Sequence, residues 1–220
     1  MENKSITMCE PSTGFVAGTL VHTKDGLVPI EKIKVGDWVL SKHENDKGDQ
    51  AYKRVTQIFS HENQVVRLLN YAVYLPDGSI TGRTLVATPN SHFRVPGKGW
   101  RKLKSLRRII DRIPLETFNG SRAMICRNCD IYVSQSPDIA WICLDKPSHR
   151  GAYYDLIHHN VLMNSDNPNL LKSDLFGVGL KDGPRRPKEN DLYRARVFNI
   201  AIEDFHTYYV DELGVWIRNE

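Results

Sequence analysis

The chain lacks a membrane-spanning run, a cysteine framework and a strong charge of either sign. None of its 220 residues lies in an apolar run of about 18 residues, the length that crosses a bilayer. Its four cysteines are too few for a disulfide-stapled scaffold. Its net charge of +4 is too small for the dense basic face of a nucleic-acid-binding protein. We therefore expect a reducing compartment and no membrane partner, and the charge disfavours a nucleic-acid partner.

Other signals are missing as well. Residues 1–14 have no apolar core of signal-peptide length, so a native start here predicts a cytoplasmic chain. The sequence contains no tandem repeat or heptad series. It also contains no glycine-rich phosphate loop, GxSxG elbow or HExxH helix, and its carboxylates show no spacing typical of an acid and base pair. We therefore expect no cofactor, and nothing positive indicates an unrelated enzyme.

What the chain does contain favours an all-β fold. Runs rich in Val, Ile, Thr, Tyr and Phe recur between turn signals, and helical periodicity is scarce. Asp25 and Gly26 accept the positive φ angles of a type I′ turn, which predicts a hairpin between residues 15–23 and 27–30. A short helical turn is expected at 31–35. Further strands are predicted at 38–41, 53–59, 65–74, 79–87, 140–144, 153–158, 195–203 and 207–210.

The length and the 40% hydrophobic composition predict one domain. We expect an N-terminal flank at residues 1–13 and a domain at 14–220, with a long polar surface insert at about 164–191. The spacing of Leu103 and Leu106 predicts a basic helix over 101–112. Such a helix could bind phosphates or present an ordinary solvated face.

Cys126 and Cys129 have the spacing of half a zinc knuckle, and Cys143 is a further potential ligand. A structural zinc site needs a second closely spaced pair of ligands, which the chain lacks. The alternative is a tight turn flanked by two thiols, so these three cysteines are only weak metal candidates.

Two distant segments carry a family resemblance: GFVAGTLVHTKDGLVPIEKIKVGDWVLS at 14–41 and FNIAIEDFHTYYVDELGVWIRN at 198–219. Together they resemble the opening and closing blocks of the Hint family, the self-processing domains of inteins, hedgehog proteins and bacterial polymorphic toxins. The resemblance is fair at 84–106 and thin between 107 and 190. It implies an intein-like twisted horseshoe of many short strands, with pseudo-two-fold halves and one or two short helices.

The resemblance also implies where the chemistry of the family would lie. The nucleophilic cysteine of the family aligns with Gly14, which has no side chain to attack with. In TPNSHFRV the motif threonine aligns with Thr88 and its histidine with Ser91, so His92 is one residue late. Successive side chains of a strand point to opposite faces, so we expect His92 to point away from the site unless a bulge restores it.

At the C-terminal end the family uses an asparagine that cyclises and a histidine that protonates the leaving amine. Asn219 matches the asparagine, but Arg218 stands in the place of the histidine and cannot shuttle a proton. His206 matches a histidine found in the penultimate block of relatives. We treat Asn219, His206, Thr88 and His92 as vestigial site residues.

These losses predict a Hint domain of the pretoxin type that no longer cleaves or splices and has a structural role. Residual autoproteolysis at Asn219 is one alternative, and a basic binding module for nucleic acid or protein is a second. The resemblance implies a delivery region upstream and a toxin domain downstream, in a parent protein that can be secreted. An immunity protein is a further candidate partner.

Overall fold

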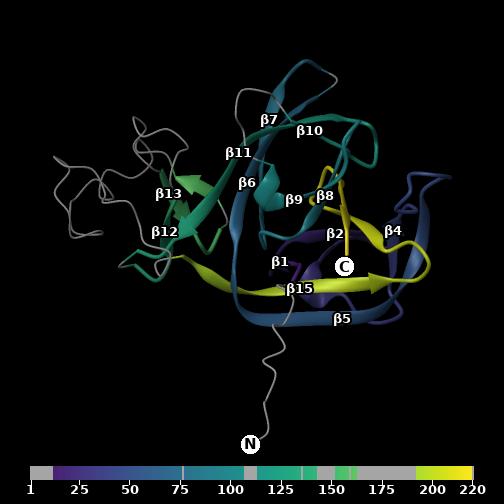
Figure 1. Ribbon diagram of the computed structural model, residues 1–220, viewed down its shortest axis with the longest axis horizontal. Helices are drawn as coiled ribbons and strands as arrows, with labels where there is room; N and C mark the ends of the chain where they lie inside the picture. Colours follow the sequence, from purple (N-terminus) through teal and green to yellow (C-terminus); the bar gives the residue numbers. More distant parts are fainter. Residues whose placement is uncertain are drawn as a thin grey trace, which may run out of the picture.

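The computed structural model describes residues 12–75, 77–106, 113–134, 136–142, 152–158, 160–162 and 192–219. These residues form mostly antiparallel strands (Figure 1). The helical elements among them are two 3-10 turns, η1 (Ile30–Lys32) and η2 (Leu103–Ser105). Neither helix is long or apolar enough to cross a membrane.

The strands are short, and most of them pair in hairpins. The first part of the chain contains β1 (Phe15–Val16), β2 (Leu20–Thr23), β3 (Gly26–Pro29), β4 (Trp38–Ser41), β5 (Ala51–Val65), β6 (Arg67–Tyr74), β7 (Ile80–Ala87), β8 (His92–Val95) and β9 (Gly99–Lys102). The second part contains β10 (Pro114–Leu115), β11 (Arg122–Tyr132), β12 (Ile139–Ile142), β13 (Ala152–Asp155), β14 (Asn160–Leu162), β15 (Arg194–Ile202), β16 (Thr207–Val210) and β17 (Val215–Arg218). The predicted all-β fold class is confirmed.

Two long strands join the hairpins into a horseshoe. β5 pairs with β4 through its first residues and with β15 along the rest of its length. β5 and β15 run side by side along the base of Figure 1. β11 pairs with β6 and then, through Ile131 and Tyr132, with β12. Because each long strand belongs to two sheets, the chain forms one continuous curved structure.

The alternation of side chains along these strands separates two apolar cores. Phe15 and Leu69 face the main core, whereas their neighbours Val16 and Leu68 face a second core covered by β12, β13 and β14. Successive strand residues point to opposite faces, so a sheet covered on both sides reads as a continuous apolar run. β1 and the parts of β6 and β15 near it therefore carry apolar residues of both cores, which holds the backbone next to Gly14.

The predicted helix over 101–112 is wrong in its described part. Residues 101 and 102 end β9, and η2 forms a single 3-10 turn. Leu103 and Leu106 are both buried because a 3-10 turn places residues three apart on one side. Residues 107–112 lie outside the described part, and so does the predicted insert at 164–191.

The first hairpin is present, but its predicted type I′ turn is wrong. β2 and β3 pair Thr23 with Gly26, so Lys24 and Asp25 form the loop. Gly26 has a φ of 106°, and neither loop residue has a positive φ. The glycine is needed one position later than predicted, at the first residue of β3.

Candidate functional site

Gly14 lies directly before β1 and is held by backbone pairing on two sides. Phe15 pairs with Phe198 of β15 and with Ala87 of β7. The amide of Thr88, the residue after β7, donates to the carbonyl of Gly14 at 2.9 Å. The Thr13–Gly14 peptide bond, which the chemistry of the family would cleave, is therefore held in a defined position.

The Ser91 hydroxyl binds both backbone groups of Gly14. The amide of Gly14 donates to Ser91 Oγ at 3.1 Å, and Ser91 Oγ donates to the carbonyl of Gly14 at 3.1 Å. Thr88 Oγ1 lies 3.0 Å from Ser91 Oγ. Since the Ser91 proton is directed to Gly14, the Thr88 hydroxyl donates to Ser91. All three residues are buried, and they form a closed cluster of neutral groups.

The site has no room for a side chain at position 14. A Cβ atom added to Gly14 would lie 2.7 Å from the carbonyl oxygen of Phe198 and 3.3 Å from a methyl group of Val197. The first contact is with backbone, and β15 pairs there with both β1 and β5. An atom of a packed strand cannot move aside as a flexible side chain can. The site is therefore closed around glycine.

His92 lies one residue after Ser91, at the start of β8. Its backbone pairs with Arg218 of β17 and with Lys102 of β9, and its side chain is buried. The hydroxyl that binds Gly14 comes from Ser91. The structure thus brings Thr88 and Ser91 to Gly14, and it brings His92 to the strand that carries Arg218.

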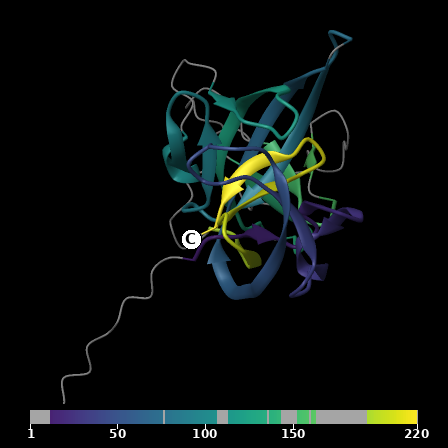
Figure 2. The same cartoon turned by 90° about the vertical axis from the view of Figure 1, so that its right-hand side faces the viewer.

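Both ends of the domain meet at two adjacent residues of β15. Asn199 Nδ2 donates to Thr13 Oγ1 at 2.8 Å, and Asn219 Nδ2 donates to the carbonyl of Ile200 at 2.7 Å. β17 ends close to β1 in both views (Figure 1 and Figure 2). Thr13 and Asn219, which lie near the two ends of the described chain, are therefore close together.

Asn199 was missed by sequence reasoning. Its Oδ1 accepts from the hydroxyl of Tyr208 at 2.8 Å and from the amide of Ile200 at 2.9 Å. Burial raises the pKa of Tyr208, so its hydroxyl keeps its proton and acts as the donor. The sequence signal for Asn199 is a single amide within the otherwise apolar run of β15.

The predicted C-terminal residues contact each other through backbone. The amide of Asn219 donates to the carbonyl of His206 at 3.1 Å. His206 has a φ of 55°, and its side chain is exposed. Arg218 pairs with Thr207 of β16 as well as with His92. His206 thus approaches Asn219 with its carbonyl group.

Cys126 and Cys129 both lie in β11, so the predicted tight turn between two thiols is wrong. A bulge makes Cys126 the extra residue of the strand, and its side chain is exposed. Cys129 is buried in the second core. Among the described residues, no group of three or more His, Cys, Asp or Glu side chains has a metal-binding arrangement. Cys143 lies outside them.

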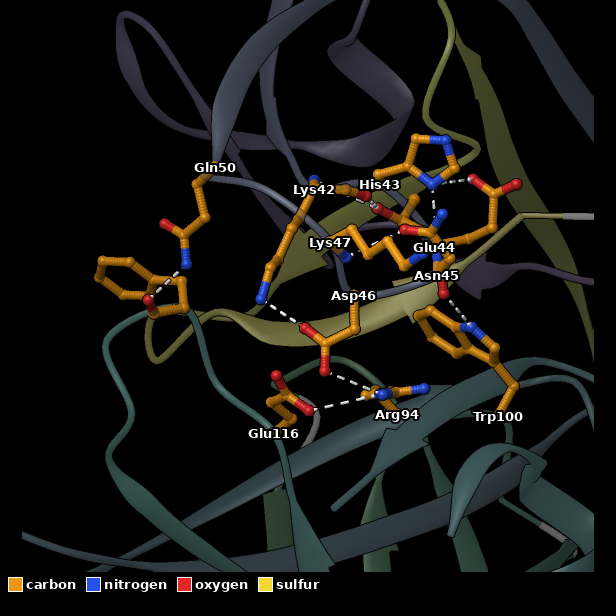
Figure 3. A network of polar contacts seen from close by, with 12 residues as sticks. Lys42, His43, Glu44, Asn45, Asp46, Lys47, Gln50, Arg94, Trp100 and Glu116 are labelled. Atoms are coloured by element: carbon orange, nitrogen blue, oxygen red, sulfur yellow. Dashed lines mark hydrogen bonds and ion pairs between the residues drawn. The ribbon is translucent and has the colours of Figure 1, made fainter. Parts of the chain in front are cut away.

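A network of charged side chains connects the loop between β4 and β5 to β8 (Figure 3). Asp46 forms ion pairs with Lys42 and with Arg94 of β8, the latter at 2.9 Å. Arg94 Nε lies 3.4 Å from a carboxylate oxygen of Glu116. The hydrogen bond from Lys42 lowers the pKa of Asp46, whereas burial raises the pKa of Glu116. This network fastens the loop to β8, which begins directly after Ser91.

Comparison with known proteins identifies the fold. Residues 20–116 match the model of the pretoxin Hint domain. The chain is similar to a bacterial intein-like domain from Clostridium thermocellum, with a TM-score of 0.54 and 21% identity over 94% of this chain and 98% of that one. It is also similar to a DnaB intein from Synechocystis, with a TM-score of 0.49 and 12% identity over 95% of this chain and 99% of that one. No curated protein matches the chain. The protein thus contains a Hint-type domain with the intein-like fold, and the resemblance to the pretoxin Hint family is confirmed.

Proposed function

We propose that this Hint-type domain does not process itself and instead serves as a rigid module that holds its two ends side by side. One observation carries this proposal: glycine stands where the family has its nucleophile, in a site closed around its backbone. Nucleophilic cleavage needs a thiol or hydroxyl on that residue. The site therefore keeps the bond in position without a group to attack it.

The neighbouring hydroxyls do not replace the missing nucleophile. Thr13 Oγ1 accepts a hydrogen bond from Asn199, and Ser12 Oγ donates to Gln64 Oε1 at 2.6 Å. Each would also act on its own upstream peptide bond, one or two bonds out of register. Attack geometry tolerates errors of only about 1 Å. The positions of both residues therefore support the proposal that the domain does not cleave itself.

The C-terminal end contains the asparagine of the family, but a hydrogen bond restrains its side chain. Cyclisation requires Asn219 Nδ2 to turn toward its own carbonyl, whereas that atom donates to Ile200 at 2.7 Å. Arg218 stands where the family has its histidine, and arginine does not act as a proton donor to a leaving amine. Residual cleavage after Asn219 is the competing function, since the attacking amide is still present.

The structural role follows from the position of the two ends. Thr13 and Asn219 are bound by adjacent residues of β15, so segments attached before and after the domain emerge together. The pretoxin match supports a delivery region before the domain and a toxin after it. We propose that the domain spaces and orients these two regions. An immunity protein would then recognise the toxin.

The test is a fusion of the full chain to a different folded reporter at each end. Intact mass is followed for several days at neutral pH, and Asn219→Ala serves as the matched control. We expect both proteins to stay whole. Release of the downstream reporter from the wild type, but not from Asn219→Ala, would show that the domain still processes itself.

A further inference from the structure

A cavity lies on the sheet of β6, β7 and β11, on the face away from the main core, and the site at Gly14 does not use it. β11 pairs with β6, and β6 with β7 (Figure 1). Asn70 pairs with Thr84 on one side and with Arg127 on the other. Directly opposite residues of antiparallel strands lie on the same face. Three polar side chains from three strands therefore share this face.

The bulge in β11 creates the arrangement. Ile125 pairs with Tyr71 and Arg127 pairs with Asn70, so Cys126 is the extra residue between them. A bulge changes the direction of the side chains that follow it and is common near functional sites. In a regular strand of the same sequence, Cys126 would pair with Asn70 and Arg127 with Leu69, which would place Arg127 on the opposite face. The bulge thus brings a guanidinium group and a thiol to one cavity.

The cavity is an open pocket whose volume is that of a small-molecule site. Its volume is about 380 Å³, within the range of about 300–1,000 Å³ typical of ligand pockets. Ala72 and Gly82 form a low apolar floor, and a Cβ atom added to Gly82 would meet nothing within 4 Å. Val161 of β14 forms an apolar wall. A flat or apolar group fits above this floor.

The charges of the lining favour an anion. No carboxylate is among the described residues that line the cavity. Arg83, which lines it, is paired with Glu212 at 2.7 Å. Within the described part of the chain, Arg127 takes part in no hydrogen bond or ion pair. Thr84 Oγ1 accepts from Asn70 Nδ2 at 2.6 Å, which leaves its own proton as a donor.

We propose that this cavity binds a small organic anion, a carboxylate or a phosphate monoester with an apolar body. The planar guanidinium of Arg127 binds the anionic group, because two parallel N–H donors match the oxygens of either group. The Thr84 hydroxyl donates a further hydrogen bond. The apolar body covers Ala72 and Gly82 and contacts Val161. This binding requires no processing activity.

Cys126 lines the cavity and its side chain is exposed, so its alkylation reports on the site. The full chain is treated with anionic iodoacetate or neutral iodoacetamide, and each cysteine is followed by peptide mapping. Arg127→Gln is expected to lower the ratio of the two rates at Cys126 about three-fold, through loss of local anion attraction. The control is Arg122→Gln, on the same strand but over the Tyr74 ring and outside the lining. It should leave the ratio unchanged.

Protection of Cys126 in the wild type tests the ligand class without a variant. Phenyl phosphate, benzoate and neutral benzyl alcohol are each added up to about 10 mM, the range of weak fragment binding. Protection from iodoacetamide by either anion, but not by the alcohol, supports the proposal and distinguishes phosphate from carboxylate. Equal protection by the alcohol, or none by either anion, would overturn it. Because this experiment uses the wild type, it tests the proposal even if Arg127→Gln fails to fold.

Discussion

In the function that we propose, the two ends of this domain lack opposite parts of the same chemistry. At the N-terminal end, Ser91, which Thr88 contacts, binds the backbone of Gly14, the position that aligns with the nucleophile of the family and has no attacking group. At the C-terminal end the proposed attacking amide of Asn219 is present, but Arg218 aligns with the proton donor of the family. What survives at both ends is the set of hydrogen bonds that fixes the backbone. We infer that these contacts are kept because they stabilise the fold.

The ends also differ in how tightly they are enclosed. Ser91 is 2% exposed, and the carbonyl of Phe198 leaves no space beside Gly14. Asn219 is only half-buried. A change at the N-terminal end should therefore cost more stability than a change at the C-terminal end. Substitution of Asn199 breaks the link between the ends. Substitutions at Gly14, Ser91 and Asn219 change one end at a time.

The largest effect is expected at Asn199, which joins the ends. Asn199→Leu removes the hydrogen bonds of the Asn199 amide to the buried hydroxyls of Thr13 and Tyr208, so we expect a loss of about 3 kcal/mol in the free energy of unfolding. Urea unfolding measures it. Tyr208→Phe removes one of these bonds and should cost about 1 kcal/mol. Equal losses in the two variants would show that Asn199 does not link the ends.

Gly14→Ala should lower the free energy of unfolding by about 2 kcal/mol, because its Cβ would overlap the carbonyl of Phe198. Gly82→Ala is the matched control, since a Cβ there meets nothing within 4 Å. It should be neutral or slightly stabilising. Urea unfolding of both variants compares them directly. A Gly14→Ala protein as stable as the wild type would mean that the site is open.

Ser91→Ala and Asn219→Ala compare the two ends with matched deletions. Ser91→Ala strands the amide of Gly14 in a buried cluster and should cost about 1.5 kcal/mol. Asn219→Ala removes a bond from a half-buried residue, where water can replace the lost partner, and should cost about 0.5 kcal/mol. Thermal and urea unfolding of the two variants give the order. The reverse order would contradict the difference in enclosure.

The smallest effect is expected in the pH dependence of stability, which involves the charged network and not the neutral groups at the two ends. The hydrogen bond from Lys42 lowers the pKa of Asp46 in the folded protein. This contribution is therefore present above the unfolded pKa of about 3.9 and is lost as the pH falls through the lower folded value. Lys42→Met should flatten the acid limb of stability against pH. Ser91→Ala should leave its shape unchanged, since its partners do not titrate there.

The framework of the fold is readable from the sequence, because local patterns determine it. Strands at Trp38–Ser41 and Thr207–Val210 are predicted to the residue, since turn residues bound each of them. β11 was not predicted, because Arg, Asn and Asp interrupt its apolar pattern and a bulge shifts the alternation.

The candidate site was only partly predictable. The alignment of Gly14, Thr88 and Ser91 comes from short motifs, and these residues meet in space. The bond from Asn199 to Thr13 joins residues 186 positions apart, so no local pattern indicates it. The closure of the site by the carbonyl of Phe198 is a backbone contact that no side-chain pattern can show. Contacts of this kind depend on the register of β1 against β15.

The most direct test of the closed site restores the lost groups. Gly14→Cys combined with Ser91→His, with a folded reporter upstream, is incubated with a thiol and followed by intact mass. Cooperative unfolding of the same protein establishes that it is folded. We predict that it stays whole, because the carbonyl of Phe198 excludes the new side chain from its attacking position. Release of the reporter by cleavage between Thr13 and residue 14 would contradict this account.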